Sequence, residues 1–371
     1  MKDIPLIVGA GPTGLAAALF LAERGVRSRV VDAAPQPATE SRAQVVNPRA
    51  LELLESSGVA QAMVAQGRSI RRARLYEDWE LVAELAVADA HPHYQMTVLA
   101  QSRSEALLAR ALRTYRIEPE FGVQLGSLRP QATQVEAELD HLDGAHEIVQ
   151  APLLLGADGA HSRVRDQLGI AFEGSAFPES WHLHDIELDT PLDRESAHVC
   201  FVKGGLVFLL GLEGWVWRVF GNLPDLLDHL PPGTLRAGEP TWSSSFHISH
   251  RLAAKEVVGR VAIAGDAAHV HSPVAARGMN LGIEDAWVYA HCASDFLAGQ
   301  TERLEDHGRL RHAVHKRLVH RIRLLTTLAR GQPGVVGMVR DQLIPRLVKF
   351  GPSAHAMVAM LTGLDSEVRL H

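Results

Sequence analysis

The sequence predicts an α/β protein with two domains, one built on a parallel sheet and the other on a mainly antiparallel β-sheet, followed by C-terminal helices. Three observations support this prediction. A short apolar run at residues 4–8 leads through a glycine-rich turn into a segment rich in alanine and leucine, which is typical of a buried helix. Segments in the middle of the chain alternate between apolar and polar residues, as strands with one buried face do. Residues 303–330 and 334–361 have the composition of helices.

The composition is that of a globular protein large enough for two domains. Of the 371 residues, 46% are hydrophobic and 22% are charged, as in folded domains. The net charge of −6 gives no reason to expect nucleic acid as a partner. The two cysteines, Cys200 and Cys292, do not suggest a disulfide framework, and the 20 histidines show no spacing typical of a metal site.

No segment of the sequence suggests export or insertion into a membrane. The run at 4–8 is too short for the apolar core of a signal peptide. No apolar stretch approaches the roughly 20 residues that a membrane helix needs. We therefore expect a cytoplasmic protein without a membrane span.

The N-terminal part of the chain reads as strand, turn, helix and second strand. The strand at 4–8 is apolar throughout, as in a parallel strand that is buried on both faces. The helix at 15–24 ends at Gly25, a natural helix cap. The second strand, at 28–31, ends at Asp32, where a carboxylate can accept hydrogen bonds from the hydroxyl groups of a ribose.

The turn has the sequence Gly-Ala-Gly-Pro-Thr-Gly from Gly9 to Gly14. Gly9 permits the tight bend, Gly11 lets the backbone approach a pyrophosphate, and Gly14 lets the helix pack closely on the strand. Pro12 and Thr13 lead into the helix, whose first N–H groups attract phosphate. An ordinary glycine turn is the alternative, but the flanking strand and helix favour dinucleotide binding.

Two further strand ends carry glycine and aspartate. The first reads Leu-Leu-Gly-Ala-Asp-Gly-Ala-His-Ser-Arg-Val-Arg, so that a buried strand turns at Asp158 and passes into a helix. The second reads Arg-Val-Ala-Ile-Ala-Gly-Asp and ends at Gly265 and Asp266. After a loop that contains Pro273, residues 278–282 open another helix.

In this order and separation, the three motifs resemble those of the class A flavoprotein aromatic hydroxylases, the group of p-hydroxybenzoate hydroxylase and phenol hydroxylase. The resemblance extends from residue 4 to about residue 285. It implies a Rossmann-like FAD-binding domain, FAD as the cofactor and NADH or NADPH as the electron donor. It also implies a monooxygenase reaction, in which reduced flavin and O₂ form a flavin hydroperoxide that hydroxylates an electron-rich ring.

The resemblance also implies roles for single residues. Asp158 matches an acid implicated in binding both FAD and NAD(P)H. Asp266, next to Gly265, matches the aspartate that binds the ribityl and pyrophosphate region. The residues after Pro273 match the backbone that hydrogen-bonds the pyrimidine edge of the flavin: Gly278, Met279 and Asn280. A helix N-terminus at that place stabilises negative charge on reduced flavin.

Two arginines also match positions of the family. Arg42 matches an arginine close to the flavin and the pyrophosphate, and Arg103 matches one that contacts the adenosine side of FAD. The alternative for each is a surface salt bridge.

The sequence departs from the family just before the flavin helix. The family usually has two glycines and a glutamine where this chain has Ala275, Ala276 and Arg277. Alanine adopts a positive φ less readily than glycine. Arg277 adds a permanent cation, which could bind an anionic substrate, steady the reduced flavin or point to solvent.

We expect both main domains to be discontinuous in sequence, with the substrate domain forming a sheet that roofs the flavin, as in the family. The stretches are 1–70, 96–170 and 260–300 for the FAD-binding domain, 71–95 and 171–259 for the substrate domain, and 301–371 for the C-terminal helices. The helix at 303–330 carries eight Arg or Lys and four His. It presents either a solvated face or a surface for a membrane or a partner.

The roof strands offer apolar side chains for a substrate pocket, although the same side chains could form the core of the sheet. These candidates are Phe201, Phe208, Leu210, Trp217 and Val219. His182 and His184 alternate on one strand, so His182 is a candidate for deprotonating a phenol. A single histidine more often has a structural role.

Three alternatives to a hydroxylase remain. The pair Trp215 and Trp217 resembles the start of a halogenase signature, but the Ile-Pro that completes it is missing, and no lysine lies between Lys2 and Lys203. The second alternative is a non-oxygenating reductase or dehydrogenase on the same scaffold, and the third is a flavin-binding protein without catalysis. As partners we expect a small aromatic substrate and O₂, and we expect a monomer or a homodimer.

Overall fold

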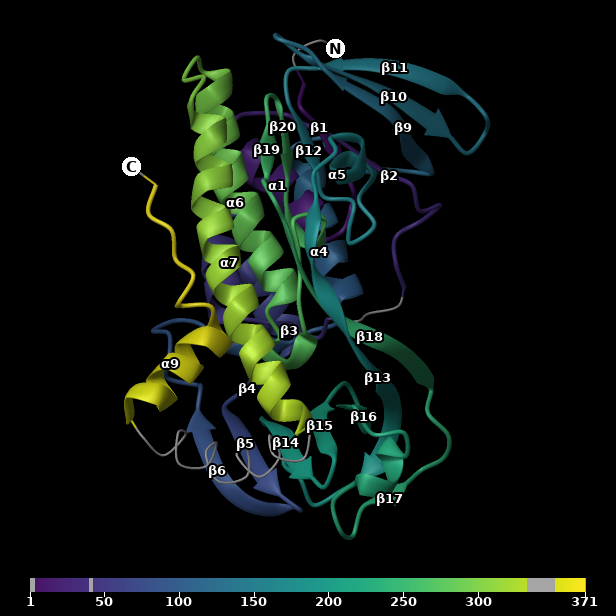
Figure 1. Cartoon of the computed structure of the whole chain (residues 1–371), viewed down its shortest axis with the longest axis vertical. Coiled ribbons are helices and arrows are strands. Elements are labelled where there is room, and N and C mark those ends of the chain that lie inside the picture. The colour runs from purple at the N-terminus through teal and green to yellow at the C-terminus, as the bar shows by residue number, and fades with distance from the viewer. Residues whose placement is uncertain (1–3, 40–42, 332–350, 371) are drawn as a thin grey trace.

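The computed structural model describes residues 4–39, 43–331 and 351–370. Figure 1 shows the parallel sheet with its helices in the upper part of the molecule and the large antiparallel sheet in the lower part. The long helix α7 (Arg303–Arg330) runs alongside both parts.

The first sheet has six strands in the order β19-β20-β12-β1-β2-β8. Their bounds are Val257–Val258 (β19), Val261–Ile263 (β20), Leu154–Gly156 (β12), Leu6–Val8 (β1), Arg29–Asp32 (β2) and Glu120–Phe121 (β8). Neighbours pair in parallel, except that β19 and β20 are antiparallel. The predicted first strand, helix and second strand are confirmed, with ends that differ by at most three residues.

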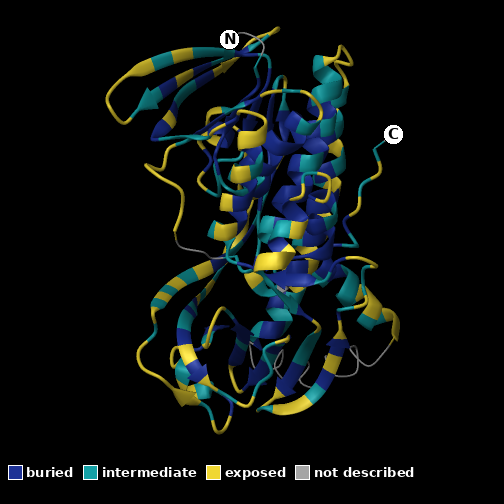
Figure 2. Cartoon of the chain, turned by 180° about the vertical axis from the view of Figure 1, so that it is seen from behind, coloured by how far each residue is buried: buried dark blue, intermediate teal, exposed yellow. Residues whose placement is uncertain are grey.

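Both faces of this sheet are covered, as its apolar strands predict. Ile7 of β1 faces the helices α1 (Pro12–Glu23) and α6 (Gly278–Leu297). Leu6 and Val8 point the other way and pack against a smaller three-stranded sheet. The strands of that sheet are β9 (Val123–Pro130), β10 (Val135–His141) and β11 (His146–Ala151). Figure 2 shows that buried residues gather around the central helices, whereas exposed residues lie on outer strands and loops.

The large sheet has the order β21-β18-β13-β16-β15-β14-β5-β6, and the short β17 pairs with β13. Its strands are β5 (Arg72–Glu77), β6 (Glu80–Ala86), β13 (Phe172–Asp189), β14 (Ser196–Val202), β15 (Gly205–Gly211), β16 (Val216–Gly221), β17 (Leu235–Arg236), β18 (Trp242–Ala253) and β21 (His269–Val270). All neighbours are antiparallel except β14 and β5. The predicted second domain on a mainly antiparallel sheet is therefore confirmed. The chain enters this sheet at β5, at β13 and at β21, while the domain boundaries given above remain a prediction.

The remaining described elements are a small sheet, further helices and 3-10 turns. They are the sheet β3-β7-β4 (Val45–Val46, Met96–Val98 and Arg68–Ile70), the helices α2 (Pro48–Leu53), α3 (Val59–Gln66), α4 (Gln101–Thr114), α5 (Arg163–Gln167) and α9 (Gly351–Thr362), and the 3-10 turns η1 (Leu226–His229), η2 (Gly265–Ala267) and η3 (Pro273–Ala275). Helix α7 has the predicted bounds. The predicted helix at 334–361 lies outside the described residues except for the part seen as α9.

Candidate functional site

A large cavity lies between the parallel sheet and the large antiparallel sheet. Its volume is about 1190 Å³, above the roughly 300–1,000 Å³ of a pocket for one small ligand. One end is lined by the turns that follow β1, β12 and β20, which is where α/β sheets bind their ligands. The other end is lined by the large sheet, α7 and α9. The cavity can therefore hold a dinucleotide and a second molecule.

The three glycines of the first turn have different surroundings. Gly9 has a φ of +110°, and a Cβ there would lie 2.2 Å from the carbonyl oxygen of Ala157. A Cβ on Gly14 would lie 1.9 Å from the carbonyl oxygen of Gly9. A Cβ on Gly11 would meet no atom within 4 Å, and Gly11 lines the cavity. Gly9 and Gly14 are thus required by the fold, whereas Gly11 opens to the space for a ligand.

Helix α1 directs its N-terminus toward the same space. Gly11 is its N-cap and forms no side-chain cap, and Pro12 occupies its first position. The first N–H groups of a helix have no partner within the helix, so a phosphate can accept hydrogen bonds from them. Together with the cavity volume and the open Gly11, this arrangement fits the pyrophosphate of FAD.

Asp32 stabilises the glycine turn from the end of β2. Its Oδ2 accepts a hydrogen bond from the N–H of Ala10 at 2.6 Å, and its Oδ1 accepts one from the N–H of Ala34 at 2.8 Å. Each carboxylate oxygen has room for a further donor. The predicted contact with a ribose is compatible with this geometry and stays a prediction.

Asp158 has a local structural task as well. Its Oδ1 accepts a hydrogen bond from the Ser162 hydroxyl at 2.6 Å, and its Oδ2 accepts one from the N–H of Val164 at 3.1 Å. Burial raises the pKa of the Asp158 carboxyl. The side chain holds the turn at Gly159, which lines the cavity. Its role in binding FAD and NAD(P)H stays a prediction.

Thr13 joins the first motif to the third. A Cβ on Gly265 would lie 2.5 Å from Thr13 Oγ1, and a Cβ on Gly282 would lie 2.2 Å from the same atom. Gly265 also has a φ of +61°. The two glycines therefore leave the space that Thr13 occupies between η2 and α6. Asp266, which follows Gly265, is exposed and lines the cavity.

A buried network of charged side chains supports the third motif, and the sequence did not predict it. Asp285 on α6 accepts hydrogen bonds from the N–H of Gly265 at 3.0 Å, from His269 at 2.7 Å, from His315 at 2.7 Å and from Arg311 at 2.6 Å. The other ring nitrogen of His315 lies 2.7 Å from Glu256. These contacts tie the turn after β20 to α6 and α7. The four-residue spacing of His307, Arg311 and His315, all buried on one face of α7, was the available signal.

The network shifts the pKa values of its members in opposite directions. Burial lowers the pKa of His315, but Asp285 and Glu256 outweigh this effect and raise it to about 9. Burial raises the pKa of Glu256, but His315 and His312 lower it to about 2. Burial likewise opposes ionisation of Asp285, yet His315, Arg311 and His269 keep its pKa well below the usual range. His315 is therefore an imidazolium between two carboxylates at neutral pH.

The segment before α6 keeps a left-handed backbone without glycine. Ala276 has a φ of +51°, which costs an alanine about 1 kcal/mol relative to glycine. Asn280 compensates, because its Nδ2 donates to the carbonyl of Ala276 at 2.8 Å and to that of Val45 at 2.9 Å. The side chain of Asn280 is thus structural, and the predicted contact with the flavin concerns the backbone of residues 278–280. Pro273, Gly278 and Met279 line the cavity.

Arg277 does not point to solvent, because it is fully buried. Its Nη1 donates to the carbonyl of Met360 at 2.8 Å, and its Nη2 donates to the hydroxyl of Ser366 at 2.6 Å. The carboxylates of Glu284 and Asp365 each lie 3.4 Å from its guanidinium. This pairing argues against a primary role in binding an anionic substrate.

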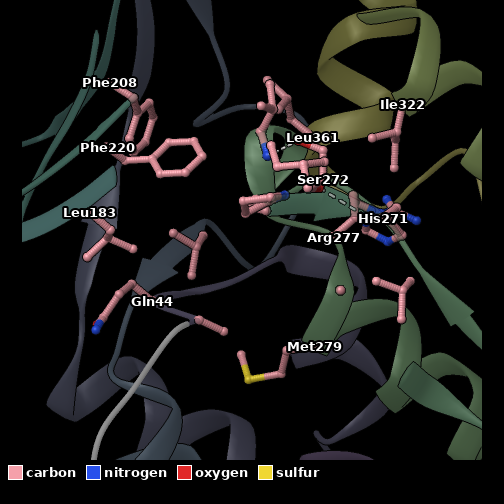
Figure 3. A pocket seen from close by; sticks show the side chains of 18 of the residues that line it. Gln44, Leu183, Phe208, Phe220, His271, Ser272, Arg277, Met279, Ile322 and Leu361 are labelled. Carbon is pink, nitrogen blue, oxygen red and sulfur yellow. Dashed lines mark hydrogen bonds between the residues drawn. The ribbon is translucent and has the colours of Figure 1, made fainter. Parts of the chain in front are cut away.

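The large sheet presents an apolar face to the cavity. Alternate side chains from seven of its strands line it: Leu75, Leu85, Leu183, Val199, Phe201, Leu206, Phe208, Leu210, Phe220 and Phe246. The rings of Phe220 and Phe246 stack with centroids 6.0 Å apart, and Phe208 meets Phe220 edge-on at 6.5 Å. Figure 3 shows Phe208, Phe220 and Leu183 together on this face. Such a surface suits the faces and edges of aromatic rings.

The sequence placed two of its pocket candidates, Trp217 and Val219, on the wrong face of the sheet. Trp217 is 1% exposed, does not line the cavity and packs with Ile186 and Val219 on the far face of the sheet. Its neighbours Arg218 and Phe220 line the cavity instead. Strand β16 has large apolar side chains on both faces, Phe220 toward the cavity and Trp217 and Val219 away from it, so apolar character alone does not distinguish the faces.

His182 and His184 do not line the cavity, whereas Leu183 between them does. Because successive side chains point to opposite faces of a sheet, both histidines face away from the ligand space. His184 instead contacts the Ser243 hydroxyl at 2.8 Å, and burial lowers its pKa. The interpretation of His182 as a base for a substrate in this cavity is therefore wrong for the described geometry.

Of the two predicted arginine contacts, one falls outside the described residues. This residue is Arg42. Arg103 forms a salt bridge with Glu213 at 2.8 Å, and about half of its side chain is exposed. This is the surface pairing that the sequence left as an alternative, and a contact with adenosine stays a prediction.

The comparisons with known proteins agree with the geometry of the glycine turns. A family model described as an FAD binding domain matches residues 4–204 and 226–322. The chain belongs to this family. The resemblance to the class A FAD-dependent aromatic hydroxylases is thereby confirmed, and FAD is the cofactor that the family binds.

Curated relatives of the chain include two bacterial monooxygenases. The chain is 36% identical over 346 residues to 6-methylpretetramide 4-monooxygenase of Streptomyces rimosus. This match covers 87% of this chain and 61% of that protein. It is 33% identical over 307 residues to pentachlorophenol 4-monooxygenase of Sphingobium chlorophenolicum, and this match covers 76% of this chain and 56% of that protein. The chain thus spans about three fifths of the length of these relatives.

A crystal structure of p-nitrophenol 4-monooxygenase from Pseudomonas putida DLL-E4 has the same fold. The TM-score is 0.85 at 21% identity, with 99% of this chain and 98% of that chain covered. Among the described residues, no helix has the length and apolar character needed to cross a membrane.

Proposed function

We propose that the protein is an FAD-dependent monooxygenase that hydroxylates an aromatic small molecule, with NADH or NADPH as the electron donor. The single observation that carries this proposal is the continuity of the cavity. It runs from a dinucleotide-binding turn at Gly11 to an apolar wall with the aromatic side chains Phe208 and Phe220. A cofactor bound at one end would lie against a ring bound at the other.

The residues at the first end would bind and orient FAD. The N-terminus of α1 and the open Gly11 suit the pyrophosphate, and Asp266 is placed on the lining where the adjoining part of the cofactor would pass. The start of α6, at Gly278 and Met279, would face the flavin, where the helix dipole favours negative charge on a reduced ring. FAD, when bound and reduced, supplies the chemistry that activates O₂.

The residues at the second end would orient the substrate and exclude water. The lining from the large sheet is mainly apolar, and α7 and α9 add Ile322, Leu325 and Met357 from the other side. Water exclusion matters because activated oxygen species are otherwise lost to side reactions. None of these tasks requires a protein nucleophile.

The decisive experiment is turnover of the purified, FAD-loaded protein with a panel of phenols and fused-ring aromatics. We expect at least one compound to stimulate NADH or NADPH oxidation and to gain one oxygen atom from ¹⁸O₂, detected by mass spectrometry. Flavin reduction without incorporation of oxygen would support the reductase or dehydrogenase alternative. A halogenated product in the presence of halide would support the halogenase. If neither NADH nor NADPH reduces the bound flavin in the presence of any compound of the panel, the result would support a flavin-binding protein without catalysis.

A further inference from the structure

Arg277 connects the start of α6 to the C-terminal end of the described chain. Its two terminal nitrogens donate to the Met360 carbonyl and to the Ser366 hydroxyl, and the carboxylates of Asp365 and Glu284 balance its charge. Hydrogen bonds that involve a buried charged group are stronger than neutral ones, and loss of the donor leaves buried acceptors without a partner. The cation therefore fixes the position of this C-terminal segment against α6.

The segment that Arg277 fixes is also a wall of the cavity. Met357, Met360 and Leu361 of α9 line the ligand space. In Figure 3, Leu361 and Arg277 lie on one side of the cavity, across from the aromatic side chains of the large sheet. Val358 packs on the large sheet and on the small sheet β3-β7-β4. Helix α9 thus forms part of the cavity wall that faces the large sheet.

The turn that follows α9 is seated tightly on α2. Gly363 has a φ of +85°, and a Cβ there would lie 2.6 Å from Asn47 Nδ2 and 2.8 Å from Arg49 Cβ. The N–H of Asn47 in turn donates to Asn280 Oδ1 on α6 at 2.9 Å. The wall formed by α9 and the turn after it therefore rests on α2 and on the start of α6. Arg277 supplies the charged contact between this wall and α6.

We propose that Arg277 is a positioning residue, which fastens residues 357–366 across the substrate end of the cavity and thereby limits the size of the ring system that fits. This inference rests on the proposed function, since it assumes that the apolar end holds the substrate. The family's usual glutamine has neither the charge nor the number of N–H donors to serve all of these acceptors. In this chain, the arginine at position 277 matches the acceptors that Met360, Asp365 and Ser366 place around it.

The test compares Arg277→Gln with the matched control Arg321→Gln. Arg321 contacts the other oxygen of the Asp365 carboxylate at 3.4 Å, but half of its side chain is exposed. The first readout is amide hydrogen exchange of the FAD-loaded protein. We expect exchange in residues 357–366 to be at least about tenfold faster in Arg277→Gln and unchanged in Arg321→Gln. Unchanged exchange in Arg277→Gln overturns the proposal.

The second readout is the selectivity for ligand size, which a merely structural role would not change. The affinities of 2-naphthol and of the larger 1-hydroxypyrene are measured from the change in flavin absorbance. We expect the affinity ratio to shift toward 1-hydroxypyrene by at least about fivefold in Arg277→Gln and not in Arg321→Gln. Faster exchange with an unchanged ratio reduces Arg277 to a role in stability and also overturns the proposal.

A second variant, Ser366→Ala, removes one acceptor without altering α6, so the proposal remains testable if Arg277→Gln does not fold. It should shift both readouts in the same direction by a smaller factor, and a variant identical to the wild type counts against the proposal. Neither readout requires turnover. Failure to detect a hydroxylated product would therefore overturn the proposed function while the role of Arg277 could still be measured.

Discussion

The two ends of the cavity are built by different means. At the end with the glycine turns, the backbone itself determines which residue is allowed, since any side chain on Gly9 or Gly14 would collide with a carbonyl oxygen. At the apolar end, the lining comes from alternate positions of several strands, and many apolar residues could serve there. The first end is thus specified by single residues, and the second by the register of a sheet. If this difference is real, single substitutions should have larger effects at the first end than at the second.

Replacing Gly14 with alanine should damage the first end most severely. The new Cβ would lie 1.9 Å from the carbonyl oxygen of Gly9, so the helix and the strand would have to separate. We expect a loss of at least about 3 kcal/mol in the free energy of unfolding, together with loss of bound flavin. Denaturant unfolding and the flavin content after purification measure both effects. A stable, flavin-loaded Gly14→Ala protein would contradict the backbone-based account.

The network around Asp285 joins the two ends, because it links the turn at Gly265 to α7. His315 has a folded-state pKa of about 9, above its ordinary value of about 6.5. Its stabilising effect is therefore complete below about pH 6.5 and is lost as the pH rises through 9, with a total of about 3 kcal/mol. The loss should be seen in unfolding curves recorded between pH 6 and 10.

In His315→Gln, this alkaline loss of stability should disappear, and the variant should be less stable than the wild type at pH 6.5. His320→Gln changes an exposed histidine of the same helix and serves as the control. On the acid side, Glu256 has a pKa of about 2, below its ordinary value, so its contribution is present above about pH 4.5 and is lost as the pH falls through 2. If the His315→Gln variant still loses stability between pH 6 and 10, another titrating group causes that loss.

Gly11→Ala should separate cofactor binding from folding at the first end. Its Cβ would meet no protein atom within 4 Å and would point into the ligand space. We expect stability without FAD to change by less than about 0.5 kcal/mol, while the Kd for FAD rises about tenfold or more. Titration of the apoprotein with FAD gives the Kd. Equal FAD affinity in the variant and the wild type would remove Gly11 from the binding site.

At the second end, a neutral ring should bind better than an anionic one. The arginines that line the described cavity already have protein acceptors: Arg165, Arg218, Arg251 and Arg277. We expect 2-naphthoate to bind at least about tenfold more weakly than 2-naphthol, because its carboxylate would have to compete with these acceptors or be buried without a partner. The neutral 2-naphthamide controls for size. Affinities are read from flavin absorbance, and tighter binding of 2-naphthoate would show that an arginine exchanges its partner for the ligand.

The smallest effect concerns Ala276, which adopts a left-handed conformation just before α6. Ala276→Gly should raise the free energy of unfolding by up to about 1 kcal/mol, because glycine adopts the observed φ of +51° without strain. Ala298→Gly, at a position with a φ of −77°, should not stabilise the protein. Thermal unfolding distinguishes the two variants, and an increase of melting temperature in both would point to a cause other than the sign of φ.

The sequence was most informative where geometry restricts the choice of residue. The glycine turn, the helix after it and Asp32 could be predicted, because a positive φ and a close approach of backbone exclude most side chains. Trp217 could not be assigned to a face, since its strand carries large apolar side chains on both sides. The partners of Arg277 lie 83 and 89 residues further along the chain, and no local pattern connects them. The network of His315 likewise depends on acids that only the packing of α6 against α7 brings near.

The pairing of distant strands has a consequence for how the chain acquires its structure. Strand β1 pairs with β12, and β12 pairs with β20, while β18 of the other sheet finds its last partner in β21. Residues 257–270 contain β19, β20 and β21. Neither sheet can therefore be completed before this stretch has been synthesised. During synthesis the cavity between the two sheets should stay incomplete until that stretch leaves the ribosome, and contacts of such long sequence separation form slowly. Because its binding site is lined by both sheets, we expect FAD to bind late in folding.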